Sequence, residues 1–189
     1  MAPSDNSVLR CVSYNSRGFN ESRRHYICNV LYACDMLFLQ EHWLSDDQLV
    51  LLNSLSSEHV AVGISGFGDA DILNGRPYGG CAIVWRTSLC LQAMPIDSGS
   101  RRVCAVLFSG QNLKLLCISV YMPFEHNDNS WEEFQYQLAV IDALCEQHPD
   151  CQVVLGGDFN VDVMRNWSHT ALLNDFLHAG QFDSCHTAC

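Results

Sequence analysis

Basic residues are scarce in this 189-residue sequence, which has 10 lysines and arginines against 21 acidic residues and a formal net charge of −11. A protein that stores or coats nucleic acid is expected to be basic, because its affinity comes from neutralising phosphates. The composition therefore excludes that class of protein. An acidic enzyme can still act on nucleic acid where metal ions and local arginines neutralise the phosphates.

Long apolar runs and a leader-like N-terminus are also missing. No stretch approaches the roughly 20 apolar residues that span a membrane. Residues 1–7 lack the basic and apolar regions of a secretory signal. We therefore expect an intracellular protein, cytoplasmic or nuclear, with no membrane partner. We also expect a flexible N-terminus over residues 1–7 and a single domain over residues 8–189, and nothing in the sequence predicts an oligomer.

The 11 cysteines include no CxxC pair. Their number is odd, and several lie inside apolar, strand-like segments, where a reduced thiol packs as a small apolar side chain (Cys11, Cys81, Cys104, Cys117). This pattern predicts buried reduced thiols rather than a disulfide framework. The tail Cys185-His186-Thr187-Ala188-Cys189 matches no standard zinc-ligand spacing, so we predict no zinc site there.

Apolar strand-like segments alternate with amphipathic helical ones, which predicts an α/β sandwich with mixed sheets. Strands are expected over residues 8–14, 36–40, 59–63, 81–86, 89–94, 103–108, 113–121 and 152–155, the last of them buried. Helices are expected over 21–34, 46–55, 131–147 and 168–178. Residues 81–86 and 89–94 are predicted to pair around a Thr87-Ser88 turn, and 103–121 to form a hairpin. Residues 66–80, rich in Gly, Asp and Asn, are predicted to be a surface loop.

Polar residues follow four of the apolar strands, namely Asn15, Glu41, Tyr121 and, after Gly156-Gly157, Asp158 with Asn160. Each has a structural alternative: Asn15 as a turn cap, Glu41 as the return to solvent, Tyr121 as a core aromatic, and Asp158-Phe159-Asn160 as an ordinary turn. Open α/β sheets bind ligands beyond their strand ends, where such side chains converge. Four strand ends with these residue types therefore predict one site.

These residue types suit phosphate chemistry with a magnesium or manganese ion. Mg²⁺ takes oxygen ligands, which Glu41 and Asp158 can supply. Asn15 and Asn160 can hold phosphate oxygens, and Tyr121 can donate a hydrogen bond as charge develops on the phosphoryl group. Gly156-Gly157 would let the backbone approach the site closely. Arginines that could hold phosphates, or simply be solvated, are Arg17, Arg23, Arg24, Arg76, Arg101 and Arg102.

Four segments resemble, in order, the motifs of the endonuclease/exonuclease/phosphatase superfamily. They are Ser13-Tyr14-Asn15-Ser16-Arg17-Gly18, Leu39-Gln40-Glu41-His42-Trp43, Ser119-Val120-Tyr121-Met122-Pro123 and Gly156-Gly157-Asp158-Phe159-Asn160. Asn-Ser-Arg-Gly-Phe and Arg76-Pro77-Tyr78-Gly79-Gly80-Cys81-Ala82-Ile83 resemble the branch found in animal non-LTR retrotransposons. That branch nicks target DNA, so the resemblance implies a DNA partner and a fused reverse transcriptase.

The resemblance implies a four-layer α/β/β/α sandwich of the DNase I-like type, with two packed mixed sheets. It implies that Glu41 binds the metal ion, shared with Asp158, and that Asp158 and Asn160 orient the attacking water and the scissile phosphate. Asn15, Arg17 and Tyr121 would complete the substrate site. His42 is expected to lie behind the site or at the surface.

The family pattern continues past Gly-Gly-Asp-Phe-Asn to a Ser-Asp-His element that this sequence does not match, although it contains His169, His178 and His186. We therefore expect a domain that is incomplete at its C-terminus, lacks the last strands and is close to inactive as written. The alternatives that remain are a phosphatase acting on a lipid or nucleotide headgroup, an RNA exonuclease of the same superfamily, and a non-enzymatic remnant or interaction domain.

Overall fold

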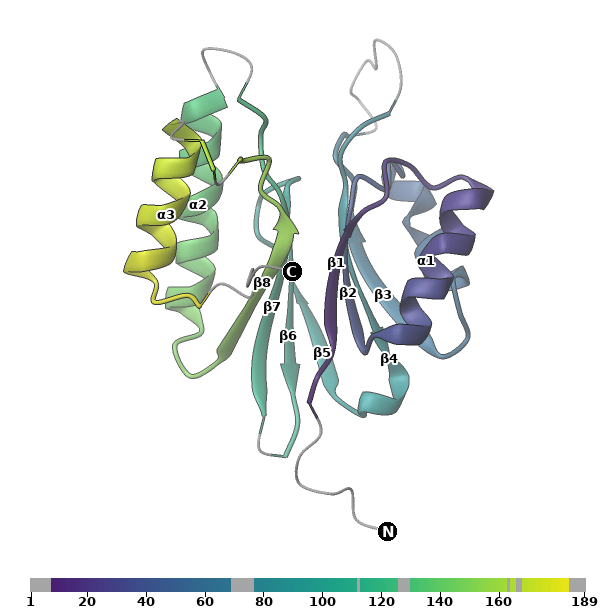
Figure 1. Ribbon diagram of the computed structural model, residues 1–189. Coiled ribbons are helices and arrows are strands. Elements are labelled where there is room, and N and C mark those ends of the chain that lie inside the picture. Colours follow the sequence, from purple (N-terminus) through teal and green to yellow (C-terminus); the bar gives the residue numbers. More distant parts are fainter. Residues whose placement is uncertain are drawn as a thin grey trace.

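The computed structural model describes residues 8–68, 77–111, 113–125, 130–162, 164–165 and 168–183. Within these residues, eight strands form two four-stranded sheets that pack face to face and carry helices on their outer faces (Figure 1). Each sheet contains both parallel and antiparallel pairs. The predicted α/β/β/α arrangement with mixed sheets is therefore confirmed.

The first sheet has the order β1-β2-β4-β3 and comprises β1 (Cys11–Asn15), β2 (Met36–Gln40), β3 (His59–Ile64) and β4 (Cys81–Arg86). The helix α1 (Glu21–Ala33) connects β1 to β2, which run parallel with Asn15 opposite Gln40. Asn20 begins this helix, because its side chain accepts a hydrogen bond from the Arg23 amide at 3.0 Å. The carboxyl ends of β1 and β2 therefore lie side by side.

The second sheet has the order β5-β6-β7-β8 and comprises β5 (Gln92–Ile96), β6 (Val103–Ser109), β7 (Lys114–Tyr121) and β8 (Gln152–Asp158). The antiparallel pair β6–β7 confirms the predicted hairpin. The helix α2 (Ser130–Gln147) connects β7 to β8, which run parallel with Tyr121 opposite Asp158. The helix α3 (Ser168–Ala179) packs beside α2 on the outer face (Figure 1).

Strand β2 is buried on both faces, which explains its wholly apolar sequence. Met36 and Phe38 face the second sheet, whereas Leu37 and Leu39 pack under α1. The Phe38 ring lies against Gly156, where an added Cβ would come within 2.7 Å of the ring. We predicted that Gly156 serves the site, but this glycine makes room for the contact between the two sheets.

Two predicted elements differ from the structure. Residues 81–86 and 89–94 do not pair, because β4 already has β2 and β3 on its two sides. The chain instead turns through a short 3₁₀ helix, η2 (Thr87–Leu89), and β5 joins the other sheet. The predicted helix after Ser45 is also a 3₁₀ helix, η1 (Asp46–Ser54), which begins with a capping box between Ser45 and Gln48.

The expected burial also needs correction in two places. Strand β8 is longer than predicted and only half-buried, because among the described residues it has one neighbouring strand, β7. Cys81, Cys104 and Cys117 are buried between the sheets as predicted, but Cys11 is exposed. Four predictions fall outside the described residues: the flexible N-terminus 1–7, most of the 66–80 loop with Arg76, part of the turn before Leu113, and the tail 185–189. No helix in the described ranges combines the length and apolar character that crossing a membrane requires.

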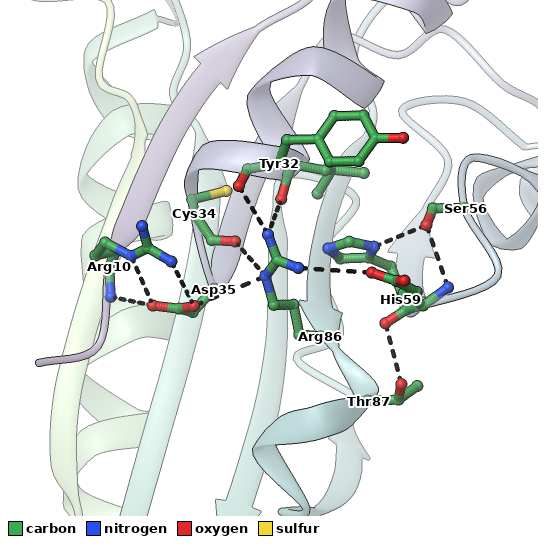
Figure 2. Close-up of polar contacts among 10 residues, drawn as sticks. Arg10, Tyr32, Cys34, Asp35, Ser56, His59, Arg86 and Thr87 are labelled. Atoms are coloured by element: carbon green, nitrogen blue, oxygen red, sulfur yellow. Dashed lines mark hydrogen bonds and ion pairs between the residues drawn. The ribbon is translucent and has the colours of Figure 1, made fainter. Parts of the chain in front are cut away.

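A polar cluster ties α1 to the end of the first sheet where β1 and β2 begin (Figure 2). Arg86 donates hydrogen bonds to the carbonyls of Leu31, Tyr32 and Cys34 at 2.8–2.9 Å, which satisfies the last carbonyls of α1. The same guanidinium lies 3.7 Å from Asp35, which Arg10 contacts through its backbone amide and its side chain. These hydrogen bonds from Arg10 lower the pKa of Asp35.

Candidate active site

Side chains from both sheets meet at the opposite end, where β1, β2, β7 and β8 finish. Asn15, the last residue of β1, donates from one amide nitrogen to Glu41 Oε1 at 2.6 Å and to Asp158 Oδ2 at 2.7 Å. Glu41 follows β2, and Asp158 ends β8 in the other sheet. One carboxamide therefore links two carboxylates across the sandwich, with all three side chains half-buried.

Tyr121 ends β7 next to Asp158 and completes this group. Burial raises the pKa of the Tyr121 phenol, and the negative charge of Glu41 together with a hydrogen bond to it raises the pKa further. The phenol is therefore held in its protonated form. Such a group can donate a hydrogen bond to an oxygen on which negative charge develops.

Arg17 and Asn160 contact Asn15 and Asp158 through their backbone amides. The Arg17 amide donates to Asn15 Oδ1 at 3.1 Å, while the Arg17 side chain is exposed. The Asn160 amide donates to Asp158 Oδ1 at 3.0 Å, and its side-chain nitrogen donates to the Met122 carbonyl at 2.8 Å. These contacts orient the Asn15 carboxamide at the end of β1 and the Asp158 carboxylate at the end of β8.

Sequence reasoning missed Trp43, whose indole nitrogen donates to Glu41 Oε2 at 3.2 Å. It also missed Gln40, which is buried behind the site. The Gln40 side chain accepts from Ser13 at 3.2 Å and donates to Ser119 at 3.1 Å, so it joins β1, β2 and β7. Gln40 is a polar residue at the end of an apolar strand, and this position could have marked it in the sequence. The contact of Trp43 with Glu41 instead depends on the turn around Glu41.

The chain around Glu41 adopts an unusual backbone conformation. Glu41 and Trp43 have φ angles of +54° and +60°, values that non-glycine residues rarely adopt. The Glu41 amide donates to the Gly80 carbonyl at 2.9 Å, and the Trp43 amide donates to the Gly79 carbonyl at 3.1 Å. Backbone strain of this kind persists where the surroundings impose it, and it is common at functional sites.

His42 lies between those two residues and is fully buried, so the expectation that it lies behind the site holds and the alternative of a surface position is wrong. Its Nδ1 accepts from the Leu44 amide at 3.1 Å. Burial lowers the pKa of His42 to about 4, which keeps the ring neutral. A Cβ at Gly80 would approach the ring to 2.4 Å, so only glycine fits there. The His42–Gly80 contact therefore fixes the position of Glu41.

The donor set suits a hard divalent cation. Glu41 and Asp158 offer carboxylate oxygens within reach of one Asn15 amide, and Mg²⁺ commonly takes one or two protein carboxylates plus water and substrate phosphate. Within the described ranges no three His, Cys, Asp or Glu side chains gather to hold a metal ion. Carboxylate oxygens of these two residues are thus the ligands that the described residues would contribute.

A comparison with protein families matches residues 12–188 to the Endonuclease/Exonuclease/phosphatase family. The chain belongs to this family. Its members are hydrolases of phosphate esters, and they generally use divalent metal ions. A search of curated proteins finds no match.

Several solved structures share the fold. The endonuclease domain of TRAS1, a telomere-specific non-LTR retrotransposon, is 12% identical with a TM-score of 0.66, over 90% of this chain and 71% of that chain. The AP endonuclease LMAP from Leishmania major is 13% identical with a TM-score of 0.67, over 90% of this chain and 66% of that chain. The 3′ phosphatase NExo from Neisseria, bound to a product DNA hairpin, is 18% identical with a TM-score of 0.63, over 90% and 71%. The chain thus spans about two thirds of the length of these proteins.

Proposed function

We propose that this domain is a metal-dependent phosphodiesterase and that its substrate is DNA, in which it nicks one strand. The observation that carries the proposal is the pair of carboxylates, Glu41 and Asp158, held by the Asn15 amide where the two sheets meet. Clustered carboxylates without a cation partner are unfavourable in a half-buried position, so this arrangement favours a bound cation.

Each residue has a role in this proposal. Glu41 and Asp158 would hold a divalent cation, which would neutralise the phosphate charge. Asp158, fixed by the Asn160 amide, would orient the attacking water towards the phosphorus atom. Asn15, whose two amide hydrogens are taken by Glu41 and Asp158, positions these carboxylates beside the phosphate. Tyr121 would exchange its hydrogen bond to Glu41 for one to a phosphate oxygen.

The DNA substrate and the retrotransposon role rest on resemblance. The motifs around Asn15 and Tyr78 resemble those of non-LTR retrotransposon endonucleases, and the TRAS1 domain has the same fold. In that role a fused reverse transcriptase would extend the nicked strand. The second candidate is phosphate-ester hydrolysis on a smaller substrate, which the net charge of −11 favours because such an enzyme does not need to attract a nucleic acid.

The test is conversion of supercoiled plasmid to nicked circles in the presence of Mg²⁺ or Mn²⁺. Wild type, Glu41→Gln, Asp158→Asn and the exposed control Asp175→Asn are compared. In the form extended by a Ser-Asp-His segment, we expect nicking that both site variants abolish and the control retains. The same chain extended by a Ser-Asp-His segment tests the expectation that turnover needs this element: the extended form should nick far faster. Metal-dependent hydrolysis of phosphomonoesters without any nicking would replace DNA cleavage with the second candidate.

A further inference from the structure

A cleft with a volume of about 420 Å³ opens beside the candidate active site, and Tyr121 lines both. Pockets of roughly 300–1,000 Å³ commonly hold small ligands or single groups of larger ones. The cleft lies between residues 77–80, called here the Gly79 segment, the loop before β6 and the helix α2. A substrate whose phosphate lies at Tyr121 would therefore place its neighbouring group in this cleft.

The walls of the cleft present aromatic rings. Tyr78 and Tyr136 line it with 50% and 55% of their surface exposed, and they come from the two sides, the Gly79 segment and α2. Rings that are exposed at a cleft wall offer faces on which nucleobases stack, and this stacking is tolerant of sequence. A purely ionic ligand would gain nothing from these two rings.

Two arginines supply positive charge, and they are held differently. Arg102 is anchored, since its guanidinium lies over the Tyr121 ring at 5.6 Å and its Nε donates to Glu133 at 2.6 Å. Glu133 therefore offsets most of its charge. Arg101 donates to the Phe67 carbonyl at 2.9 Å, but its side chain remains 51% exposed and its pairing with Asp46 is long, at 3.5 Å. Arg101 is the cation that an incoming phosphate can contact.

We propose that this cleft binds one unstacked nucleotide next to the scissile phosphate, with its base against Tyr78 and Tyr136 and its phosphate at Arg101. The inference rests on the proposed phosphodiesterase function and names the substrate group that the site selects. A lipid headgroup fits less well, because it has no flat aromatic face to stack on the exposed rings of Tyr78 and Tyr136. Single-stranded or locally unpaired DNA is thus the preferred ligand.

Binding is tested without metal by the fluorescence anisotropy of a labelled single-stranded oligonucleotide. The variants are Tyr136→Ala and Arg101→Gln. The controls are Tyr32→Ala on the exposed side of α1 and Lys114→Gln at the exposed start of β7, the end of that strand away from Tyr121. Loss of one base stack typically weakens binding by about 10-fold, and we expect this for the Tyr136 variant. The controls should change less than about 2-fold. Equal binding by all five proteins, or no binding by wild type, would overturn the inference.

A second measurement separates this inference from the proposed function. Hydrolysis of bis(p-nitrophenyl) phosphate with Mg²⁺ or Mn²⁺, measured in the form extended by the Ser-Asp-His segment, needs the metal site but no nucleotide. Both cleft variants should therefore retain it while their KM for an oligonucleotide rises. If wild type hydrolyses the small diester but oligonucleotide binding ignores the cleft variants, the inference fails and the function stands. If oligonucleotide binding depends on the cleft but no diester is hydrolysed, the phosphodiesterase fails. Binding to phosphoinositide vesicles that the cleft variants abolish would overturn the choice of nucleotide.

Discussion

The two ends of the sandwich handle charge in opposite ways. At the end where β1 and β2 begin, Arg10 and Arg86 are paired with Asp35 and Glu58 (Figure 2). Arg86 also satisfies two carbonyls of α1 and the carbonyl of Cys34, which follows the helix. At the end where these strands finish, Glu41 and Asp158 share one neutral amide. Among the described residues, no arginine or lysine forms an ion pair with either carboxylate.

The two ends of the sandwich also differ in their backbone conformations. Arg86 has an ordinary extended conformation, and the segment after it contains one non-glycine residue with a positive φ angle, Cys90. Near the carboxylates four such residues gather, namely Arg17, Glu41, Trp43 and Asn160. Each such residue costs of order 1–3 kcal/mol. One end therefore stabilises the fold, while the other holds groups that become favourable once a cation and a phosphate bind.

The largest expected effect comes from Asp158→Asn. In the form extended by a Ser-Asp-His segment, metal-dependent hydrolysis should fall about 1,000-fold, because a metal ligand and the group that orients the water are lost together. The free energy of unfolding should change by less than about 1 kcal/mol, because the relief of like-charge repulsion is offset by one lost hydrogen bond: the new amide nitrogen must face either Asn15 Nδ2 or the Asn160 amide. Turnover and thermal unfolding of the variant and of Asp175→Asn provide the measurement. A fall in Tm of more than about 3 °C for Asp158→Asn would show that the charges at this end are already balanced.

Arg86→Ala should destabilise the end of the sandwich where β1 and β2 begin. The substitution removes the donor for the carbonyls of Leu31, Tyr32 and Cys34 and leaves Asp35 with one partner fewer, so the free energy of unfolding should fall by about 3 kcal/mol. Turnover per folded molecule should not change. Urea unfolding of Arg86→Ala is compared with that of Arg86→Lys. Lysine keeps the positive charge but lacks the planar guanidinium that donates to all three carbonyls. An Arg86→Lys variant as stable as wild type would show that the positive charge alone, without the guanidinium hydrogen bonds, stabilises this end.

The strands that build both ends were predictable from sequence, because β2, β4 and β7 are apolar runs bounded by polar residues. The convergence of Asn15, Glu41, Tyr121 and Asp158 was predictable for the same reason: they follow strands whose carboxyl ends meet. Pairing partners were not predictable where both faces are buried, since an apolar run such as β4 carries no mark of its neighbours. This is why β5 was assigned to the wrong partner.

The anchoring role of Arg86 had no sequence signal either, because a single arginine after a strand is usually at the surface. The turn at Glu41 was hidden for a different reason. Its left-handed conformation is imposed by two hydrogen bonds, from Glu41 to Gly80 and from Trp43 to Gly79, which join residues 39 and 36 positions apart in sequence. Long-range contacts of this kind leave no local pattern.

Gly80→Ala tests that turn. Gly80 has a φ angle of +88°, and its Cβ would collide with the His42 ring, so the free energy of unfolding should fall by about 2 kcal/mol. Because the Gly80 carbonyl accepts from the Glu41 amide, Mg²⁺ affinity should also fall about 10-fold. Gly99→Ala is the matched control: φ is +67°, nothing lies within 4 Å of its Cβ, and only backbone strain of about 1 kcal/mol is expected. Equal losses in the two variants would remove the role assigned to His42.

The smallest effect concerns Asp35 and is a function of pH. Hydrogen bonds from Arg10 lower the pKa of Asp35 in the folded protein, so its contribution to stability is fully present above the unfolded pKa of about 4. That contribution is lost as the pH falls through the folded pKa. The Tm difference between wild type and Asp35→Asn should therefore be constant from pH 7 to pH 5 and shrink below pH 4. Asp175→Asn, exposed and outside this cluster, should show no such trend. If the difference instead persists to the acid limit, the carboxylate charge is not what stabilises this end, and the contrast between the two ends rests on the carbonyls that Arg86 satisfies.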